Sequence, residues 1–168
     1  MKRLIAVSLM SFAVATPAVA TGFYAGVNTG WAEHEIKPNG YSEGVTAYSI
    51  LGGYAFIPYL AVEGEFANLG SIASDSAKIT ARSINVIGYY PIEPQLALYG
   101  KLGSATTQEK SSGITASHKA TTFGVGAQFI VNEFMDFRVG LTRYTYGGVK
   151  GLNEGRASFY SAGVIFRF

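Results

Sequence analysis

The sequence predicts an all-β protein, an eight-stranded antiparallel up-and-down transmembrane β-barrel that follows an N-terminal signal peptide. Segments of about ten residues alternate between apolar and polar side chains, which is the length that a tilted strand needs to cross a bilayer. Charged residues make up 14% of the chain, against roughly 25% in a typical soluble domain. After the N-terminal segment no run approaches 18 apolar residues. A membrane-spanning chain of this kind must close into a barrel to satisfy its backbone groups.

The first 20 residues have the features of a secretory signal peptide. Lys2 and Arg3 precede a short apolar run, and small residues follow it. The predicted cleavage pattern consists of Ala18, Ala20 and Thr21. The run is too short to span a bilayer comfortably as a single helix. We therefore expect residues 1–20 to be removed and residues 21–168 to form one barrel domain.

Charge and cysteine content exclude several classes of function. Lys2 and Arg3 lie in the predicted signal peptide, so 11 of the 13 basic residues remain in the mature chain, against 11 acidic ones. A nearly neutral chain has no electrostatic basis for nucleic-acid binding. The sequence contains no cysteine, which excludes disulfides, thiol catalysis and cysteine-ligated metals. We expect neither a cofactor nor a metal site.

Alternation with a period of two assigns the strands in order, because successive side chains of a strand point to opposite faces. The predicted strands are Phe23–Trp31, Thr46–Phe56, Leu60–Asn68, Arg82–Tyr90, Leu96–Ala105, Thr121–Val131, Met135–Tyr146 and Ala157–Phe168. In each of them one parity is consistently apolar. In chain order these outward faces include Phe23, Tyr48, Leu60, Ile84, Leu98, Phe123, Phe137 and Tyr160.

The connections alternate between short and long. Three short turns carry proline or asparagine, and proline suits a turn because it cannot donate to a central ladder. These turns are Ile57–Tyr59, Pro91–Gln95 and Asn132–Phe134. The polar segments Ala32–Gly44, Leu69–Ala81, Thr106–Ala120 and Gly147–Arg156 are predicted long loops. Outer-membrane barrels have short periplasmic turns and longer outer loops, so we expect the long loops to face outside.

The inward parity carries most of the charged residues within strands. Glu63 and Glu65 supply two acids, and Lys101 and Arg138 supply two bases, with Gln128 among them. A lipid-facing Arg or Lys costs roughly 2–4 kcal/mol at the bilayer midplane, whereas side chains fill a narrow barrel and can pair there. We expect a lumenal ion-pair network that either fills the lumen or controls a path for small ions. Asp136 and Arg167 also share this inward parity near one end of their strands.

The two histidines offer little for catalysis. His34 and His118 both fall in predicted loops, and His118 follows Ser117. A His–Ser pair could serve an outer-membrane lipid hydrolase or acyltransferase, although no third group of fixed spacing orients either ring. Glu33 and Glu35 flank His34, which could suggest a metal site. Support for such a site is weak, because the side chains of neighbouring strand residues point apart. Solvated loop histidines are the simpler interpretation, and no catalytic residue is assigned.

The C-terminus resembles the signal that the bacterial outer-membrane barrel assembly machinery reads. That pattern has a polar residue, a glycine, an aromatic and a terminal aromatic at fixed spacing. It is matched here by Ser161, Gly163, Phe166 and Phe168. The resemblance implies an assembly signal, with the assembly machinery and periplasmic chaperones as partners.

The mature chain as a whole resembles the transmembrane domain of outer membrane protein A and related small barrels. The stretches that carry the resemblance are Phe23–Trp31, Gly52–Tyr54 with Pro58-Tyr59, Val62-Glu63 through Leu69-Gly70, Gly88–Ile92, Tyr99–Gly103 and Gly163–Phe168. It implies an integral protein of the Gram-negative outer membrane. Larger relatives add a periplasmic peptidoglycan-binding domain, which we do not expect in this chain.

The resemblance also implies a lumenal gate in which an acid on the third strand exchanges basic partners. Glu63 and Arg138 stand at the first acid and base positions. Gln128 stands where the family has an acidic residue and Ile87 where it has a lysine, so the family's partner exchange is not preserved in that form. Lys101 and Glu65 could substitute for the missing pair.

Three functions compete. The first is a structural or surface-interaction barrel that supports membrane integrity or adhesion through its outer loops, with weak conduction of small solutes or ions as a variant. Its partners would be outer-membrane lipid, lipopolysaccharide and a host or surface ligand. The second is an outer-membrane lipid-modifying enzyme that uses a loop histidine. The third is a soluble lipocalin-like carrier, which would need an apolar lumen and a polar exterior. The observed parity is the reverse and favours the first function.

Overall fold

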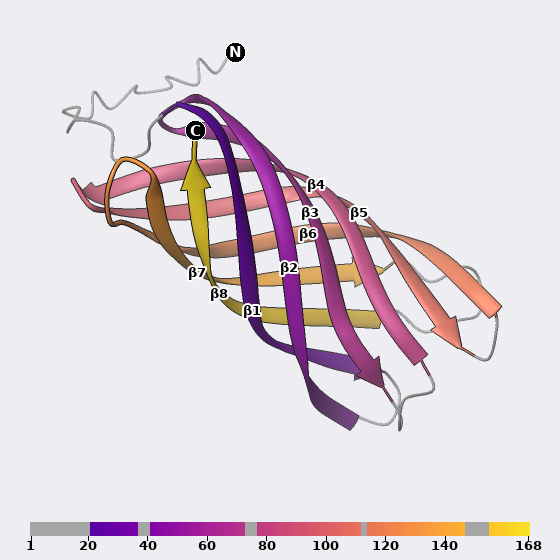
Figure 1. Cartoon of the computed structure of the whole chain (residues 1–168). Coiled ribbons are helices and arrows are strands. Elements are labelled where there is room, and N and C mark those ends of the chain that lie inside the picture. Colours follow the sequence, from indigo (N-terminus) through magenta and orange to yellow (C-terminus); the bar gives the residue numbers. More distant parts are fainter. Residues whose placement is uncertain (1–20, 37–40, 73–76, 112–113, 147–154) are drawn as a thin grey trace, which may run out of the picture.

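The computed structural model describes residues 21–36, 41–72, 77–111, 114–146 and 155–168, and within these ranges the chain forms one closed eight-stranded barrel (Figure 1). Each strand pairs antiparallel with the next, and β1 closes the ring against β8. No helix in the described part of the chain is long and apolar enough to cross a bilayer. The predicted eight-stranded antiparallel barrel is confirmed, whereas the predicted signal peptide, residues 1–20, lies outside the described residues.

The strands are longer than their membrane-spanning portions. Their bounds are β1 Gly22–Ile36, β2 Tyr41–Ile57, β3 Leu60–Ile72, β4 Ala77–Glu93, β5 Leu96–Ser111, β6 Ile114–Ile130, β7 Met135–Tyr146 and β8 Gly155–Arg167. They contain 12 to 17 residues, whereas about 9–11 suffice to cross a bilayer. The excess length therefore extends the barrel wall beyond the membrane.

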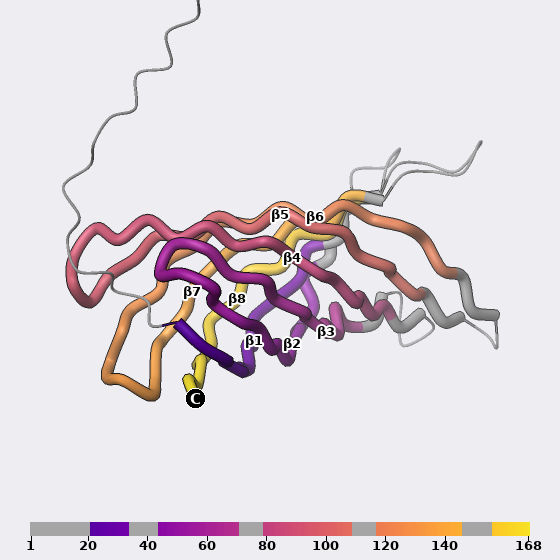
Figure 2. Tube along the Cα trace, turned by 90° about the horizontal axis from the view of Figure 1, so that it is seen from above, coloured from indigo at the N-terminus to yellow at the C-terminus, as the bar shows by residue number. Residues whose placement is uncertain are grey.

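The two ends of the barrel differ. One end, called the turn end below, holds the three short connections β2–β3, β4–β5 and β6–β7, together with the start of β1 and the C-terminus (Figures 1 and 2). The backbone N–H of Phe168 donates to the carbonyl of Phe23 there over 3.0 Å. The other end, called the hairpin end, joins β1 to β2, β3 to β4, β5 to β6 and β7 to β8.

Three of the four predicted long loops, Ala32–Gly44, Leu69–Ala81 and Thr106–Ala120, are wrong over most of their length, whereas most of Gly147–Arg156 lies outside the described residues. β1 and β2 remain paired from Ala32↔Val45 to Ile36↔Tyr41, and β5 and β6 remain paired to Ser111↔Ile114. Beyond the bilayer both faces of a strand meet water, so apolar alternation fades while the backbone ladder continues. Pro38, Asn39 and Gly40, which suggested the first loop, lie outside the described residues.

Two further boundaries are corrected. The third strand continues past Asn68 through an irregularity in its pairing with β4 between Asn68 and Ser71. Gly70 adopts a positive φ of 87°, which glycine tolerates without steric cost, and its N–H donates to Asn68 Oδ1 over 3.1 Å. The fourth strand runs to Glu93, so its turn consists of Pro94 and Gln95.

The strands are strongly tilted. Registered partners followed once round the barrel from Phe23 return to β1 at Glu33, ten residues further on. Such an offset over eight strands corresponds to a tilt of about 40°, so each residue advances roughly 2.5 Å along the barrel axis. The offset also decides which inward-facing side chains meet across the lumen.

Two sets of exposed aromatic residues bound the outer apolar surface. The set at the turn end includes Phe23, Phe56, Tyr90, Phe129, Phe137, Phe166 and Phe168. The set nearer the hairpin end includes Trp31, Tyr48, Phe66 and Phe123, with Tyr160 stacked on Trp31. Phe23 and Trp31 are eight residues apart on β1, which places the two sets roughly 20 Å apart along the axis. Outer-membrane barrels carry such aromatic girdles at both lipid boundaries.

Candidate functional site

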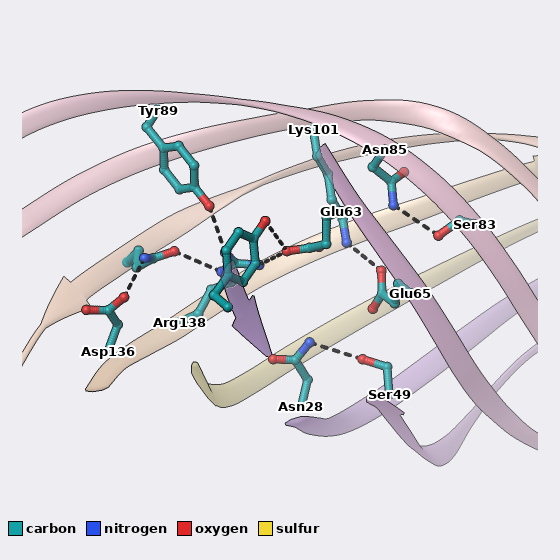
Figure 3. A network of polar contacts seen from close by, with 12 residues as sticks. Asn28, Ser49, Glu63, Glu65, Ser83, Asn85, Tyr89, Lys101, Asp136 and Arg138 are labelled. Atoms are coloured by element: carbon teal, nitrogen blue, oxygen red, sulfur yellow. Dashed lines mark hydrogen bonds and ion pairs between the residues drawn. The ribbon is translucent and has the colours of Figure 1, made fainter. Parts of the chain in front are cut away.

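The strongest candidate site is the lumenal ion-pair network, much of which is drawn in Figure 3. It lies in the half of the barrel nearer the turn end, since Glu63 and Arg138 are close to the starts of β3 and β7. Its central contact joins Arg138 of β7 to Glu63 of β3, with Nη1 donating to Oε2 over 2.6 Å. Both side chains are at most 4% exposed. β3 and β7 are four strands apart in the ring, so this contact ties opposite walls of the barrel together.

The guanidinium of Arg138 is held by several further groups. Its Nε donates to Gln128 Oε1 over 3.0 Å, and its Nη2 donates to the hydroxyl of Tyr89 over 2.8 Å. The guanidinium carbon lies 5.8 Å from the ring centroid of Tyr24 and 5.0 Å from that of Tyr99. A buried charge is tolerable when it is paired and hydrogen-bonded, and each of the three guanidinium nitrogens donates to a partner here.

Glycine makes room for the two tyrosine rings. Tyr99 is registered with Gly126, which in turn is registered with Gly140, and a Cβ at Gly140 would stand 2.1 Å from the Tyr99 hydroxyl. Tyr24 is registered with Gly53, where a Cβ would stand 2.4 Å from the ring. Tyr24 also donates to Glu63 Oε2 over 3.1 Å. Both rings can therefore lie flat against the inner wall.

Lys101 and Glu65 form a second pair. Lys101 Nζ lies 2.7 Å from Glu65 Oε2, and both side chains are at most 5% exposed. Lys101 thus has an acid of its own, separate from the acid that binds Arg138. Ile87, at the position where the resembling family has a lysine, is completely buried in an apolar cluster.

A third pair closes the network toward the turn end. Arg167 Nε donates to Asp136 Oδ2 over 2.6 Å. Gln128 Nε2 donates to the same oxygen over 2.8 Å, while Gln128 Oε1 accepts from Arg138. Gln128 therefore links the Asp136–Arg167 pair to the Arg138–Glu63 pair. The family's acid at this position is replaced by an amide that bridges two ion pairs.

The network is electrically balanced but not saturated with protein hydrogen bonds. Three acids face three bases within the described residues. One oxygen of each acid, Glu63 Oε1, Glu65 Oε1 and Asp136 Oδ1, is buried without a protein hydrogen-bond partner in the described structure. Such a neutral arrangement fills the lumen without creating a strong field for either cations or anions.

An apolar layer lies above the network toward the hairpin end. It consists mainly of inward-facing alanines contributed by seven of the strands, with three larger side chains. Its members are Ala32, Ala47, Ala67, Leu69, Ala81, Ala105, Ala120, Tyr144, Ala157 and Phe159. Leu69, Tyr144 and Phe159 have no exposed surface. Small residues on most strands leave space that these large side chains occupy, as in other small barrels whose interiors are packed.

Sequence reasoning identified the charged members of the network but missed the rest of the lumen. Tyr24, Tyr89 and Tyr99 have inward parity, which was the available signal for their role. Three of its seven alanines, Ala32, Ala81 and Ala120, lie in segments interpreted as loops, and the other four lie near the ends of predicted strands, so the layer was missed. Seven alanines of matching inward parity were the signal there.

Three of the predicted C-terminal signal residues lie on β8, and Phe168 directly follows its last residue, Arg167. Phe166 and Phe168 are exposed on the outer surface at the turn end, and Ser161 and Gly163 face the lumen side of the same strand. The cleavage residues Ala18 and Ala20 lie outside the described residues, and Thr21 directly precedes β1.

Both histidines lie in strands, which corrects their assignment to loops. His34 belongs to β1, and His118 belongs to β6, opposite Thr107. Thr107 Oγ1 donates to the backbone carbonyl of His118 over 3.3 Å. Ser117 and His118 are adjacent in an extended strand, so their side chains point to opposite faces. Within the described residues, no group of three or more His, Cys, Asp or Glu side chains could hold a metal ion.

Comparisons with known proteins agree with this architecture. A family model described as an outer membrane protein beta-barrel domain matches residues 4–168. Among solved structures, Neisserial surface protein A is similar with a TM-score of 0.72 at 18% identity, over 88% of this chain and 98% of that one. No curated protein sequence matches.

Two further solved structures show the same fold. Ail of Yersinia pestis, in complex with the heparin analogue sucrose octasulfate, has a TM-score of 0.59 at 18% identity, over 88% of this chain and 99% of that one. The N-terminal β-barrel domain of OprF from Pseudomonas aeruginosa has a TM-score of 0.58 at 14% identity, over 85% and 97%.

Proposed function

This chain belongs to the outer membrane protein β-barrel family and resides in the Gram-negative outer membrane, and we propose that it is a closed, non-enzymatic scaffold that presents its hairpin end outside the cell. In this proposal the barrel adds to membrane integrity and carries a surface for ligands. It does not serve as an open pore.

The observation that carries the proposal is the apolar layer above the ion-pair network. Ions would have to pass Tyr144 and Phe159, which are completely buried, after passing the paired charges around Arg138. Apolar constrictions block ions because water is unstable within them. A pore controlled by the ion pairs alone would need a wet path through this layer.

The alternative of a lipid-modifying enzyme has weaker support. Catalysis by His118 would need a nucleophile and an orienting group within hydrogen-bond reach. Ser117 points to the opposite face of β6, and Thr107 contacts the backbone of His118. The buried acids of the lumen are engaged in ion pairs with bases.

Export and assembly form part of the proposal. Residues 1–20 would direct secretion and be cleaved after Ala20, and the C-terminal strand would be read by the barrel assembly machinery with the help of periplasmic chaperones. N-terminal sequencing of the membrane-resident protein should begin at Thr21; retention of residues 1–20 would reject the cleavage.

The outer surface is where we expect partners. The strand extensions at the hairpin end rise beyond the apolar band and offer paired backbone as a rigid support for a ligand surface. Ail, whose barrel is similar, forms a complex with a heparin analogue, which supports a ligand-binding role for this chain. A host or surface ligand of this chain would bind there.

Conductance measurements test the closed lumen. The purified barrel in planar bilayers should show no ion current above the lipid background. Glu63→Gln combined with Arg138→Gln should remain closed, because the apolar layer is intact. Phe159→Ala, which removes a large side chain from that layer, should raise the current. A steady current through the wild-type barrel would overturn the proposal and favour a pore.

A further inference from the structure

An apolar groove lies on the outer surface near the turn end, where β1 and β2 run beside the end of β8. Its volume is about 670 Å³, within the range of roughly 300–1,000 Å³ that small-molecule sites have. Three strands, the β6–β7 turn and the residue after β8 supply its outward-facing lining. These side chains are Ala25 and Val27 of β1, Ile50 of β2, Phe134 of the turn, Phe166 of β8 and Phe168.

The shape of the groove follows from strand register and side-chain size. Ala25 is registered with Gly52 on one side and with Phe166 on the other. Val27 and Ile50, which are registered with each other, come next along their strands toward the hairpin end. Small residues therefore form the floor, and larger side chains bound it.

Phe134 is held in a fixed position at the edge of the groove. Its N–H donates to Asn132 Oδ1 over 2.9 Å, and its carbonyl accepts from the backbone N–H of Arg167 over 2.9 Å. Asparagine often organises turns through such side-chain bonds to the backbone two residues on. The β6–β7 turn is thus fastened to the end of β8, while Phe134 remains 66% exposed. This part of the groove is preformed.

The groove reaches the hydrocarbon nearest the turn end. Phe23 belongs to the aromatic set at that boundary, and Ala25 and Val27 follow it by two and four residues on β1. At roughly 2.5 Å per residue, the groove extends about 10 Å from the boundary into the membrane. This depth corresponds to the acyl chains of the leaflet at the turn end. A ligand that fits must be apolar in the groove and polar at its mouth.

The mouth of the groove is acidic. Among the described residues, the exposed charged side chains at the turn end are Glu93 and Glu133. Glu133 directly precedes Phe134, which lines the groove. Arg167 also lines the groove, but its charge is balanced by the ion pair with Asp136. The exposed bases all lie toward the hairpin end, namely Arg82, Lys119, Arg143 and Arg156.

We propose that the groove binds an acyl chain of a zwitterionic phospholipid and that Glu133 attracts the ammonium of its headgroup. The acidic mouth favours a headgroup that ends in an ammonium, as in phosphatidylethanolamine, over the anionic headgroup of phosphatidylglycerol. A second copy of this chain in the same membrane would bring the same acidic turns to the contact, which disfavours it as the occupant. The inference rests on the orientation in the proposed function, which places the turn end in the periplasmic leaflet.

Native mass spectrometry of the mature barrel, folded in neutral detergent, tests the headgroup preference. The probes are phosphatidylethanolamine and phosphatidylglycerol with identical acyl chains. We expect about fivefold stronger retention of phosphatidylethanolamine, the scale of a single exposed ion pair. Glu133→Gln should abolish this preference. Glu93→Gln is the matched control, since it removes the same charge at the end of β4, and it should keep the preference.

Substitutions in the groove test the acyl contact. Ala25→Phe fills the floor and should remove most of the bound lipid of either kind. Ala127→Phe is the matched control, because Ala127 has outward parity on β6 and stands two residues from Phe129, as Ala25 stands two residues from Phe23. It should retain lipid as the wild type does. Phe134→Ser removes one wall without changing a strand and should also reduce retention. Heat-dependent mobility in SDS gels verifies folding.

Several outcomes would overturn the inference. They are equal retention of the two lipids by the wild type, a preference that persists in Glu133→Gln, or its loss in Glu93→Gln. Equal lipid loss in Ala25→Phe and Ala127→Phe, full retention by Phe134→Ser, or a dimer that Ala25→Phe disrupts would do the same. A reversed orientation would instead appear as surface labelling of a tag at Pro58, and an open lumen as wild-type conductance. Neither result would alter these binding measurements.

Discussion

Arg138 Nη1 donates to Glu63 Oε2 over 2.6 Å across the barrel lumen, between strands that are four apart in either direction around the ring. This one contact joins β3 and β7, which share no backbone hydrogen bonds. The same guanidinium also binds Gln128 and Tyr89. The pair is therefore the central contact that holds opposite walls of the barrel together.

Removing one partner of this pair should lower the stability of the barrel more than removing both partners. We expect Glu63→Gln or Arg138→Gln alone to lower the free energy of unfolding by about 3–5 kcal/mol, because the remaining charge is buried without a partner. The double substitution should recover much of that loss. Urea titrations in lipid measure each corner of the cycle. Glu93→Gln, at the exposed end of β4, is the control and should change stability by less than about 0.5 kcal/mol. Additive effects of the two substitutions would show that the contact is not energetically coupled.

Gly140 should be sensitive to the smallest added side chain. A Cβ there would stand 2.1 Å from the hydroxyl of Tyr99, whose ring lies 5.0 Å from the Arg138 guanidinium carbon. Gly140→Ala should push the ring away and destabilise the barrel by about 1–3 kcal/mol, the usual cost of overpacking. Gly100→Ala is the control, since its Cβ would meet only a backbone oxygen at 4.0 Å. Equal stability of the two variants in urea would contradict the steric argument.

The terminal aromatic should matter for assembly rather than export. Phe168 is 82% exposed, so its deletion removes little buried surface. The deletion also removes one backbone hydrogen bond, from the N–H of Phe168 to the carbonyl of Phe23. We expect less folded barrel in the membrane and unchanged export of the chain. Phe134→Ser, an exposed aromatic on the neighbouring turn and outside the C-terminal pattern, should assemble normally. Wild-type amounts of folded protein after deletion of Phe168 would argue against the signal.

The proposed orientation can be tested on intact cells. Epitope tags inserted between Ile36 and Tyr41, or between Ser111 and Ile114, should bind antibody from outside. A tag at Pro58 or Pro94 should bind antibody after the outer membrane is opened. Surface labelling of a tag at Pro58 in intact cells would show that the orientation is the reverse of the proposed one.

Strand identity and face assignment were predictable from the sequence, because they follow from a local pattern with a period of two. Phe23, Ile84 and Phe123 are exposed, while Glu63, Lys101 and Arg138 are buried, as their parity predicts. Strand length was not predictable in the same way. Outside the apolar band no partitioning between lipid and lumen enforces alternation, so paired segments such as Glu33–Ile36 resemble polar loops in the sequence.

Which partners meet inside the barrel was decided by the tertiary structure. Parity places Glu63 and Glu65 on the same face of β3, and either acid could have met either base. The ten-residue offset around the ring sets the relative heights of the strands, and this brings Glu63 to Arg138 and Glu65 to Lys101. Pairing within two hairpins places Ala67 opposite Ala81 and Ala105 opposite Ala120, whereas contacts across the lumen depend on the offset. A local sequence pattern cannot contain that offset, because it arises when β8 closes on β1.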